Sequence, residues 1–415
     1  RKLPGQGGFD LSSFLATVLL TGYTVTLSLE IFNDQFRAGS PKAISVDGKR
    51  SLVFLMDQVQ RLEPDIRLRA PPMPDRSIVE GVAFIEFAAD ETEAAELATL
   101  LTGMGFSLKG RHRSKKVSLY RQGGINLVVN VETEGLAHST WVTHGTSAYA
   151  IGLRVANAAA TVERARALGA QPFQQKVAEG ELMIPAIRGV GGGVIYLLDG
   201  SAELGRVWET EFVDEVEPGP QPAGLSHIDH VAQTMNYEEM LTWVLFYRSI
   251  FATRKSPMVD VPDPSGLVRS QVIENADGSL RLTLNGAENN RTLAGHFVAK
   301  TFGSSVQHLA FATDDIFATA EAMSLASLEI SDTYYADLEA RFSLAPELLE
   351  RLRRYNILYD RDDGGEFFQL FSRTYGEGFF FEVLERRGTY GGYGGPNAPF
   401  RIAAQKRFLQ QGDFG

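Results

Sequence analysis

The sequence feature that most constrains the fold is a pattern that occurs four times, in which an alternating apolar segment precedes a helical one. The alternating segments occupy residues 81–90, 148–157, 226–235 and 306–315. Each leads into a stretch with helical spacing of apolar residues, and further strand-like stretches follow. Alternation is typical of a strand with one buried face, whereas a period of 3.6 residues is typical of a helix. The pattern predicts four βαβββ units and an α+β fold class.

Each predicted unit has one apolar sheet face that it cannot bury alone. We therefore expect the units to pack in pairs, with their sheets curved round a shared cavity. Stretches rich in proline and charge predict linkers at residues 65–80 and 213–223. The linkers place a first pair of units at 81–212 and a second pair at 224–400, and leave a C-terminal tail at 401–415.

Residues 1–64 precede this pattern and predict a helix, a strand and a second helix. The predicted strand is "TVTLSLEIF" (24–32), between helical stretches at 10–23 and 46–62. A strand followed by a helix is similar to the last unit of a (β/α) barrel, but one such unit cannot close a barrel. We therefore expect this segment to be disordered, docked onto the rest of the chain, or paired with a second copy. Because the chain begins with Arg1 rather than Met, we interpret it as a fragment or a processed product.

Composition excludes several classes of function. The net charge is −11, from 40 basic and 51 acidic residues, which argues against a nucleic-acid partner or an anionic membrane surface. There are no cysteines, so disulfides and thiolate metal sites are excluded, and we expect a cytoplasmic location. The most apolar early run, at 14–20, is too short to cross a membrane.

Glu382 stands between Phe381 and Val383, in a stretch that predicts a buried strand. An ionised carboxylate there is costly unless it is paired or binds a metal. His230 and His308 lie at matching places in the first strands of the third and fourth units. If these units surround one cavity, the two imidazoles and the carboxylate converge on one divalent ion. Such a site suits Fe(II), and Mn, Co, Zn and Mg are alternatives.

A histidine on a strand is more often a hydrogen-bonded structural residue than a metal ligand. The corresponding strands of the first pair carry Glu86 and Arg154 and no histidine, which predicts one metal site, in the second pair. His227 is the alternative to His230, but an odd spacing along a strand predicts the opposite sheet face. The remaining histidines are expected in loops or at strand edges, without a role in catalysis: His112, His138, His144 and His296.

Several motifs of the second pair resemble the C-terminal half of 4-hydroxyphenylpyruvate dioxygenases. They are "HIDHV", "GLVRSQVIENADGSLRLTLN", "VQHLAF", "GEFFQLFSR" and "FFFEVLERRG", in that order. The resemblance implies a vicinal-oxygen-chelate (glyoxalase/dioxygenase) fold, with iron ligands at His230, His308 and Glu382. It also implies substrate-binding residues at Ser270, Asn285, Gln369, Phe371 and Phe380. The chain departs from the family in "NGAENNRTLAGHFVAKTFGSS", which lacks the glutamines that orient the keto acid, and at Tyr393, where phenylalanine is expected.

The opening segment carries a second resemblance. "LSLEIFNDQFRAGS" (27–40), followed by "DGKRSLVFLMDQV", resembles the end of a xylose-isomerase-like barrel. In particular it resembles bacterial 3-dehydroshikimate dehydratases, in which such a barrel is fused to a dioxygenase-like C-terminal half. The resemblance implies that Glu30 is the last carboxylate ligand of the barrel metal. The other barrel ligands lie on earlier strands, which this chain lacks.

Three hypotheses for function follow from these resemblances. In the first, the chain is the dioxygenase-like, metal-binding part of a 3-dehydroshikimate dehydratase, a lyase that forms protocatechuate in quinate and shikimate catabolism. This chain alone is then expected to have no dehydratase activity. In the second, it is an Fe(II)-dependent dioxygenase of 4-hydroxyphenylpyruvate or another 2-oxo acid. In the third, it is a non-catalytic module for binding or dimerisation, stabilised by metal. The expected ligand is a small aromatic molecule or keto acid, and a homo-oligomer is left open.

Overall fold

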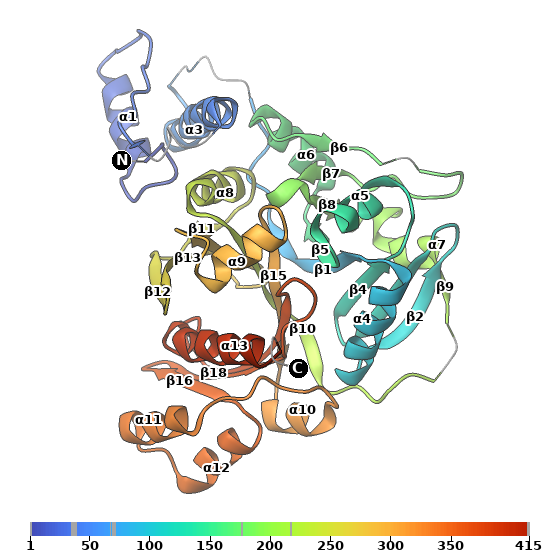
Figure 1. Cartoon of the computed structure of the whole chain (residues 1–415). Coiled ribbons are helices and arrows are strands. Elements are labelled where there is room, and N and C mark those ends of the chain that lie inside the picture. Colours follow the sequence, from blue (N-terminus) through green and yellow to red (C-terminus); the bar gives the residue numbers. More distant parts are fainter. Residues whose placement is uncertain are drawn as a thin grey trace.

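The structure is a computed structural model, which describes residues 2–34, 40–66, 68, 72–175, 177–215 and 218–412. Two sheets of nine strands each form its centre, and helices cover their edges and ends (Figure 1). A pair of N-terminal helices packs at one end of the molecule (Figure 1). Among the described helices, none combines the length and apolar character needed to cross a membrane.

The first sheet is formed by residues 79–214 and has the strand order β6-β7-β8-β5-β1-β4-β3-β2-β9. Its strands are β1 (Val79–Ala88), β2 (Ser107–His112), β3 (Val117–Gln122), β4 (Ile125–Asn130), β5 (Ser147–Val155), β6 (Pro172–Phe173), β7 (Ala186–Arg188), β8 (Val194–Leu198) and β9 (Phe212–Asp214). The accompanying helices are α4 (Glu91–Gly103), α5 (Gly135–His144), α6 (Ala158–Ala167) and α7 (Val207–Glu211), with short 3-10 turns at Val190–Gly192 and Leu204–Arg206.

The second sheet is formed by residues 225–388 and has the order β11-β13-β14-β10-β15-β18-β17-β16, with β12 paired to β13. Its strands are β10 (Leu225–Asn236), β11 (Arg254–Lys255), β12 (Val259–Asp263), β13 (Gly266–Glu274), β14 (Arg281–Ala287), β15 (Ser305–Thr313), β16 (Leu358–Asp362), β17 (Gly365–Phe371) and β18 (Phe380–Gly388). The helices are α8 (Tyr237–Ile250), α9 (Leu293–Lys300), α10 (Ile316–Ala322), α11 (Asp332–Phe342), α12 (Pro346–Arg354) and α13 (Ala398–Gly412), and a 3-10 turn spans Gly395–Asn397.

Strand pairing reproduces the fourfold repeat. In every unit the first strand runs parallel to the last: β1 with β4, β5 with β8, β10 with β14, and β15 with β18. The first strands of paired units run antiparallel to each other, β1 with β5 and β10 with β15. The predicted α+β fold of paired βαβββ units is therefore confirmed.

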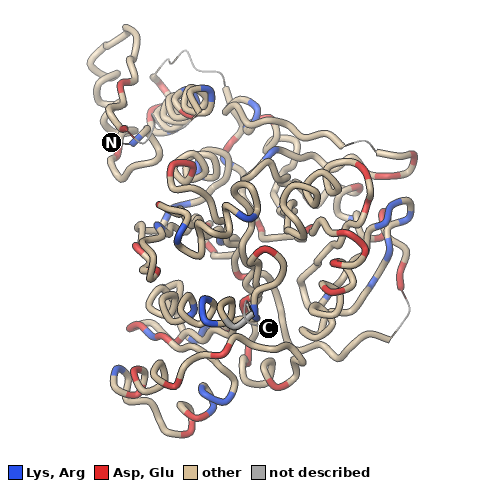
Figure 2. The backbone as a smooth tube through the Cα atoms, in the orientation of Figure 1, with Lys and Arg blue, Asp and Glu red and all other residues tan. Residues whose placement is uncertain are grey.

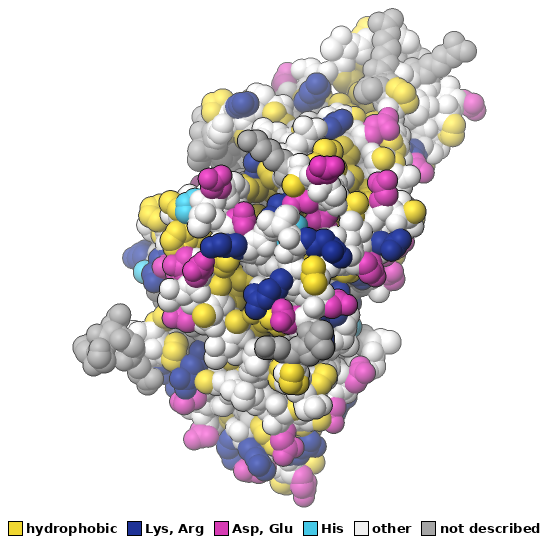
Figure 3. Space-filling model, turned by 90° about the vertical axis from the view of Figure 1, so that its right-hand side faces the viewer, with side chains coloured by type: hydrophobic (Ala, Val, Ile, Leu, Met, Phe, Trp, Pro, Cys, Tyr) yellow, Lys and Arg dark blue, Asp and Glu magenta, His cyan; other side chains and the backbone are white. Residues whose placement is uncertain are grey.

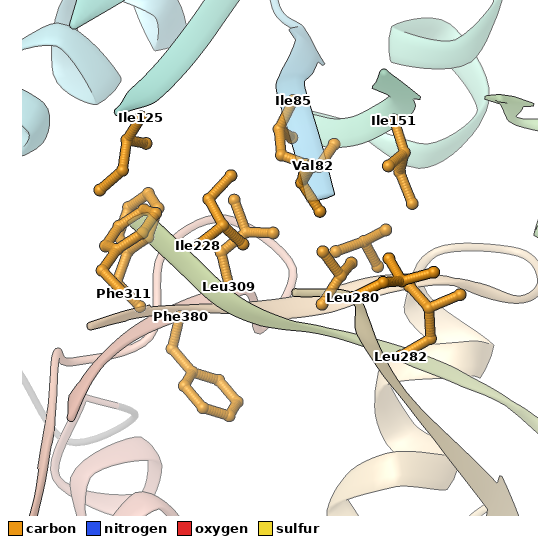
Figure 4. Packing of buried hydrophobic residues seen from close by; sticks show 14 of the residues in the cluster. Val82, Ile85, Ile125, Ile151, Ile228, Leu280, Leu282, Leu309, Phe311 and Phe380 are labelled. Carbon is orange, nitrogen blue, oxygen red and sulfur yellow. The ribbon is translucent and has the colours of Figure 1, made fainter. Parts of the chain in front are cut away.

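The main hydrophobic core lies between the two sheets. Val82, Ile85 and Ile151 from the first sheet face Ile228, Leu309, Leu280 and Leu282 from the second sheet and its margin (Figure 4). Phe380 points to the other side of the second sheet (Figure 4). Because one face of each sheet is committed to this core, the opposite faces remain for cavities.

The prediction of a strand at residues 24–32 is wrong. Helices α1 (Leu11–Leu20) and α3 (Pro41–Leu62) are present, but the stretch between 24 and 32 contains no strand. Val25 and Phe32 are 66% and 68% exposed, so their alternation does not mark a buried face. A strand is stable only when a neighbouring strand completes its hydrogen bonds, and the described residues offer none here. The structure therefore gives no support to a barrel-like βα unit in this chain.

The N-terminal helices are docked onto the rest of the chain. Asp47 and Arg50 of α3 form a buried ion pair of 2.7 Å. Thr242 of α8 donates a hydrogen bond to Asp47, and Arg50 donates one of 2.9 Å to the carbonyl oxygen of Leu168. Of the three states expected for this segment, the structure shows the docked one.

Acidic and basic residues are distributed over the whole chain (Figure 2). On the face beside the first sheet, their side chains are interspersed with hydrophobic ones (Figure 3).

Candidate metal centre

Three side chains from three neighbouring strands meet on the outward face of the second sheet. His230 lies on β10, His308 on β15 and Glu382 on β18. Ala310 is the register partner of His230 on one side and of Glu382 on the other. Residues far apart in the sequence therefore become neighbours, because adjacent strands lie about 4.8 Å apart.

The three donor atoms are spaced for a single ion. Nε2 of His230 lies 3.1 Å from Nε2 of His308, and each lies 3.5 Å from Oε2 of Glu382. Ligand atoms about 2.1 Å from one metal and at right angles to each other would be about 3 Å apart. Within the described part of the chain, these are the three residues that could hold an ion together. Two imidazoles and one carboxylate fit a divalent cation and leave coordination positions open.

A local irregularity in β10 shapes this site. The register against β15 shifts between Ile228 and His230, so Asp229 forms a bulge. Both Ile228 and Val231 belong to the core between the sheets, which shows that the simple alternation is interrupted. Bulges of this kind commonly re-aim side chains near functional sites.

Asp229 orients His230 by a hydrogen bond to the ring nitrogen that faces away from the site. Its Oδ1 accepts a hydrogen bond of 2.9 Å from Nδ1 of His230, which directs Nε2 toward the site. The same carboxylate accepts hydrogen bonds from Arg281 at 2.9 Å and from Arg386 at 3.0 and 3.1 Å. Burial alone would raise the pKa of Asp229, but His230 and Arg386 hold it well below its usual range. The carboxylate is therefore ionised and orients its neighbour.

Glu382 is fixed by a chain of amides. Nε2 of Gln369 donates to Oε1 of Glu382 at 2.9 Å, and Asn397 donates to Oε1 of Gln369 at 2.9 Å. The hydroxyl of Tyr334 donates to Asn397 at 2.9 Å. These hydrogen bonds leave Oε2 of Glu382 directed at His230 and His308. Residues that orient a ligand in this way strongly influence metal affinity.

Without a metal, the two imidazoles differ in pKa because their charged neighbours differ. Burial lowers the pKa of His230, but Glu382 and Asp229 outweigh it and raise the pKa to about 9. Burial also lowers the pKa of His308, and the positive charges of His230 and Arg401 push it further below its usual value. His308 is therefore available as a neutral ligand, whereas a metal must displace a proton from His230.

A cavity of about 670 Å³ adjoins the three residues. It is lined by four of the residues expected to bind substrate: Ser270, Asn285, Gln369 and Phe371. The fifth, Phe380, is not part of the lining. Its ring stacks on His308 with a centroid separation of 4.7 Å, so it supports a candidate ligand.

Sequence reasoning missed Arg401, which reaches this cavity from α13. Residues 401–412 were expected as a tail, but they continue this helix. The Arg401 guanidinium lies 5.0 Å from the centre of the Phe380 ring and 5.6 Å from that of Phe371. Burial lowers the pKa of Arg401 to about 10, partly opposed by Glu382 and Asp263, so it stays charged. Helical spacing in 398–412 was the available signal, but it does not show where the helix packs.

Several other predicted positions lie outside the metal centre. Glu30 is exposed, in a stretch without secondary structure, and has no partner in a metal-ligating group of the described residues. His227 is exposed and contacts the hydroxyl of Ser226, but the argument from odd spacing is wrong because the bulge interrupts the alternation. The expectation of loops or edges is wrong for three histidines, which lie in helices: His138 and His144 in α5, and His296 in α9.

Comparisons with known proteins also indicate a relation to hydroxyphenylpyruvate dioxygenases. Residues 75–213 match the family model described as hydroxyphenylpyruvate dioxygenase, N-terminal. A 4-hydroxyphenylpyruvate dioxygenase of Pseudomonas aeruginosa is 32% identical over 75% of this chain and 89% of its own length. The chain belongs to the 4-hydroxyphenylpyruvate dioxygenase family. The relatives named as dioxygenases and dehydratases are enzymes, and the group that could hold a metal is present in this chain.

Similarity to another group extends further along the chain. A 3-dehydroshikimate dehydratase of Pseudomonas aeruginosa is 44% identical over 97% of this chain. A solved structure described as a xylose isomerase-like TIM barrel/4-hydroxyphenylpyruvate dioxygenase fusion protein has a TM-score of 0.87, with 40% identity over 98% of this chain. The chain spans 65% of the length of the dehydratase and 66% of the fusion protein.

Proposed function

We propose that this chain is the dioxygenase-like part of a 3-dehydroshikimate dehydratase, and that it binds one divalent ion at His230, His308 and Glu382. The observation that carries the proposal is the extent of similarity. The dioxygenase relative matches 75% of the chain, whereas the dehydratase matches 97% with higher identity. The additional matched residues, together with the docked N-terminal helices, favour the dehydratase group.

The site supports the metal-binding half of this proposal. A divalent ion, with Fe(II) as our first choice, would supply open coordination positions for ligand oxygen atoms. Asp229 keeps Nε2 of His230 turned toward the ion, and Gln369 does the same for Oε2 of Glu382. In the cavity, Arg401 offers a positive charge to an anionic ligand, and it forms no ion pair within 4 Å among the described residues.

Dehydration is proposed for the complete protein and not for these 415 residues alone. Glu30 is our candidate for one carboxylate ligand of a separate metal site, as the resemblance implies. Since no other described residue joins Glu30 in such a site, this chain should not convert 3-dehydroshikimate to protocatechuate. Comparing turnover by this chain with turnover by a dehydratase of full length tests the point. Robust turnover by the chain alone would contradict it.

Metal content tests the binding site directly. The purified chain, reconstituted with Fe(II) without oxygen, should retain about one equivalent after gel filtration. His230→Ala, His308→Ala and Glu382→Ala should each lose it, because two remaining donors hold a divalent ion weakly. His227→Ala is the matched control, because this nearby histidine is exposed and outside the cluster. Retention of metal by all three variants would contradict the proposal.

A second candidate function is oxidation of a 2-oxo acid by the same half of the chain. Membership of the dioxygenase family and the cavity beside the three donors favour it. Here Arg401 would bind the carboxylate of the acid, and Phe371 would pack against its apolar part. Oxygen uptake by the iron-loaded chain with a panel of 2-oxo acids is the test. No uptake with any acid, despite bound iron, would remove this candidate.

A further inference from the structure

The first sheet has a cavity of its own, of about 660 Å³, on the side facing away from the main core. Residues from the first and second units and from α7 line it, including Phe84, Glu86, Tyr149, Tyr196 and Trp208. Its volume is close to that of the cavity beside the metal centre. Cavities of this size commonly bind small organic molecules.

Strand register places Glu86 at the position that His230 has in the second sheet. Glu86 is the partner of Ala150 on the antiparallel strand, just as His230 is the partner of Ala310. On the next strand, Ala150 lies beside Val194, whereas Ala310 lies beside Glu382. The carboxylate ligand is thus replaced by an apolar side chain. The first cavity is built like the second but lacks its metal-binding set.

Glu86 is a half-buried carboxyl group without a cationic partner. Asn130 donates a hydrogen bond of 2.9 Å to its Oε1, and the nearby hydroxyl of Tyr149 also favours the ionised form. Among the described residues no arginine, lysine or histidine forms an ion pair with it. Burial raises its pKa although both of these groups lower it. Such a group retains capacity for a hydrogen bond with a ligand.

Lys115 and His112, which lie near Glu86, are engaged elsewhere. Lys115 forms an ion pair of 2.8 Å with Glu181, and Nε2 of His112 lies 2.8 Å from Glu211. These pairs hold the polypeptide around the cavity and leave Glu86 without a cationic partner. His112 was expected to have no special role, and the structure places it in this wall.

Aromatic rings form a continuous wall of the cavity. Phe173 and Tyr196 have ring centres 6.3 Å apart, and Tyr196 and Phe84 are 5.7 Å apart. Phe84 lies 5.8 Å from Trp208, which lies 5.7 Å from Phe212. A row of rings at these separations favours a flat aromatic ligand, which can stack or pack edge-on.

We propose that this cavity binds a small aromatic molecule whose hydroxyl or amino group donates a hydrogen bond to Glu86. The aromatic wall contacts the ring of the ligand, and the carboxyl group selects a donor. The charged lining residues are Glu86, Glu132, Glu134, Glu211, Lys115 and Arg188. This excess of acidic groups disfavours an aromatic carboxylate. The site is independent of the metal centre and is not part of the function proposed above.

Calorimetry with the full chain tests this proposal with three small probes. Tyramine carries an amine, 4-hydroxybenzyl alcohol carries hydroxyl groups only, and 4-hydroxybenzoate carries a carboxylate. We expect tyramine or the alcohol to bind at least tenfold more tightly than the benzoate. If neither donor probe binds at millimolar concentration, or if the benzoate binds most tightly, the proposal is wrong.

Matched variants locate the binding site. Val128→Phe introduces bulk into this cavity, and Ser270→Phe does so in the metal cavity. Binding of the donor probe should fall at least tenfold in Val128→Phe and stay unchanged in Ser270→Phe. The opposite result would assign the probe to the metal cavity and overturn the proposal. An unchanged thermal melting temperature verifies that each variant is folded.

The variant Glu86→Gln distinguishes the two donor probes, tyramine and 4-hydroxybenzyl alcohol. The amide keeps the shape and an acceptor oxygen but removes the negative charge, so tyramine should lose at least tenfold in affinity. The alcohol should lose less, because a neutral donor needs only the oxygen. If both probes bind Glu86→Gln as they bind the unchanged protein, Glu86 does not contact the ligand and the proposal is overturned.

Discussion

Oδ1 of Asp229 accepts a hydrogen bond of 2.9 Å from Nδ1 of His230, its own neighbour in the sequence. The bulge in β10 makes this contact possible, because two consecutive residues of a regular strand point to opposite faces. The contact fixes which nitrogen of His230 faces the other two candidate ligands. An adjacent pair of residues therefore supplies both a ligand and its support.

This relationship predicts that Asp229→Asn weakens metal binding. The amide oxygen can still accept a hydrogen bond from Nδ1 of His230. However, the negative charge that makes Nε2 of the imidazole a stronger metal ligand is lost. We expect the affinity for Fe(II) or Zn(II) to fall about 10–100-fold, measured by competition with a chelator. Glu274→Gln is the control, since Glu274 also contacts Arg281 but not the histidine. Equal affinities of Asp229→Asn and the unchanged protein would show that the pair has no orienting role.

A second prediction concerns Arg401. Arg401→Leu removes the positive charge that the cavity offers to an anionic ligand, and a charge-assisted hydrogen bond contributes about 1.5–3 kcal/mol. We expect phenylpyruvate to bind the metal-loaded variant at least tenfold more weakly, as measured by calorimetry. Metal content should not change, and Arg401→Lys should recover part of the affinity.

Arg407→Leu is the matched control for this experiment. Arg407 lies on the same helix but is exposed to solvent. If Arg407→Leu weakens binding as much as Arg401→Leu, the effect comes from general charge or from the helix, and not from a contact in the cavity.

The sequence was sufficient to predict that the metal-centre residues meet, because the prediction depended on repeat and alternation alone. His230 and His308 stand in the first strands of two units, and Glu382 stands in a last strand. First and last strands of a unit are adjacent in a βαβββ fold, so the topology brings the three together. A bulge cannot be recognised from the alternation of apolar residues in a sequence. For this reason the argument that His227 lies on the opposite sheet face from His230 was wrong.

Features that depend on tertiary packing could not be predicted in this way. The stretch at 24–32 has strand-like alternation but no neighbouring strand among the described residues, so it forms none. Arg401 reaches the cavity because α13 packs against it, and no local pattern gives that position. Glu86 was noted only because its strand carries no histidine, although the aromatic wall around it makes it the centre of a second cavity.

A third prediction tests how the N-terminal helices are held. Asp47 and Arg50 are both about 5% exposed, so Asp47→Ala leaves a buried guanidinium without its partner. Breaking a buried pair in this way costs about 3–5 kcal/mol. We expect the free energy of unfolding to fall by that amount in urea, and limited proteolysis to cut α3 first. The double variant Asp47→Leu with Arg50→Met should be much less destabilised, because it leaves no charge unpaired.

The last prediction concerns the effect of low pH on the ion pair between Glu181 and Lys115, beside the first cavity. Burial would raise the pKa of Glu181, but hydrogen bonds from Lys115, Ser114 and the amide of Ala178 lower it to about 2, from 4.5. A lowered pKa in the folded state means that the ionised group stabilises the fold above pH 4.5 and loses this effect as the pH falls toward 2. The difference in unfolding free energy between the unchanged protein and Glu181→Gln should therefore be constant from pH 7 to pH 5. Below pH 4.5 it should shrink, in urea titrations at each pH at which the chain is folded. A difference that grows as the pH falls would show that Glu181 is protonated in the folded protein and that its pair with Lys115 does not close the wall.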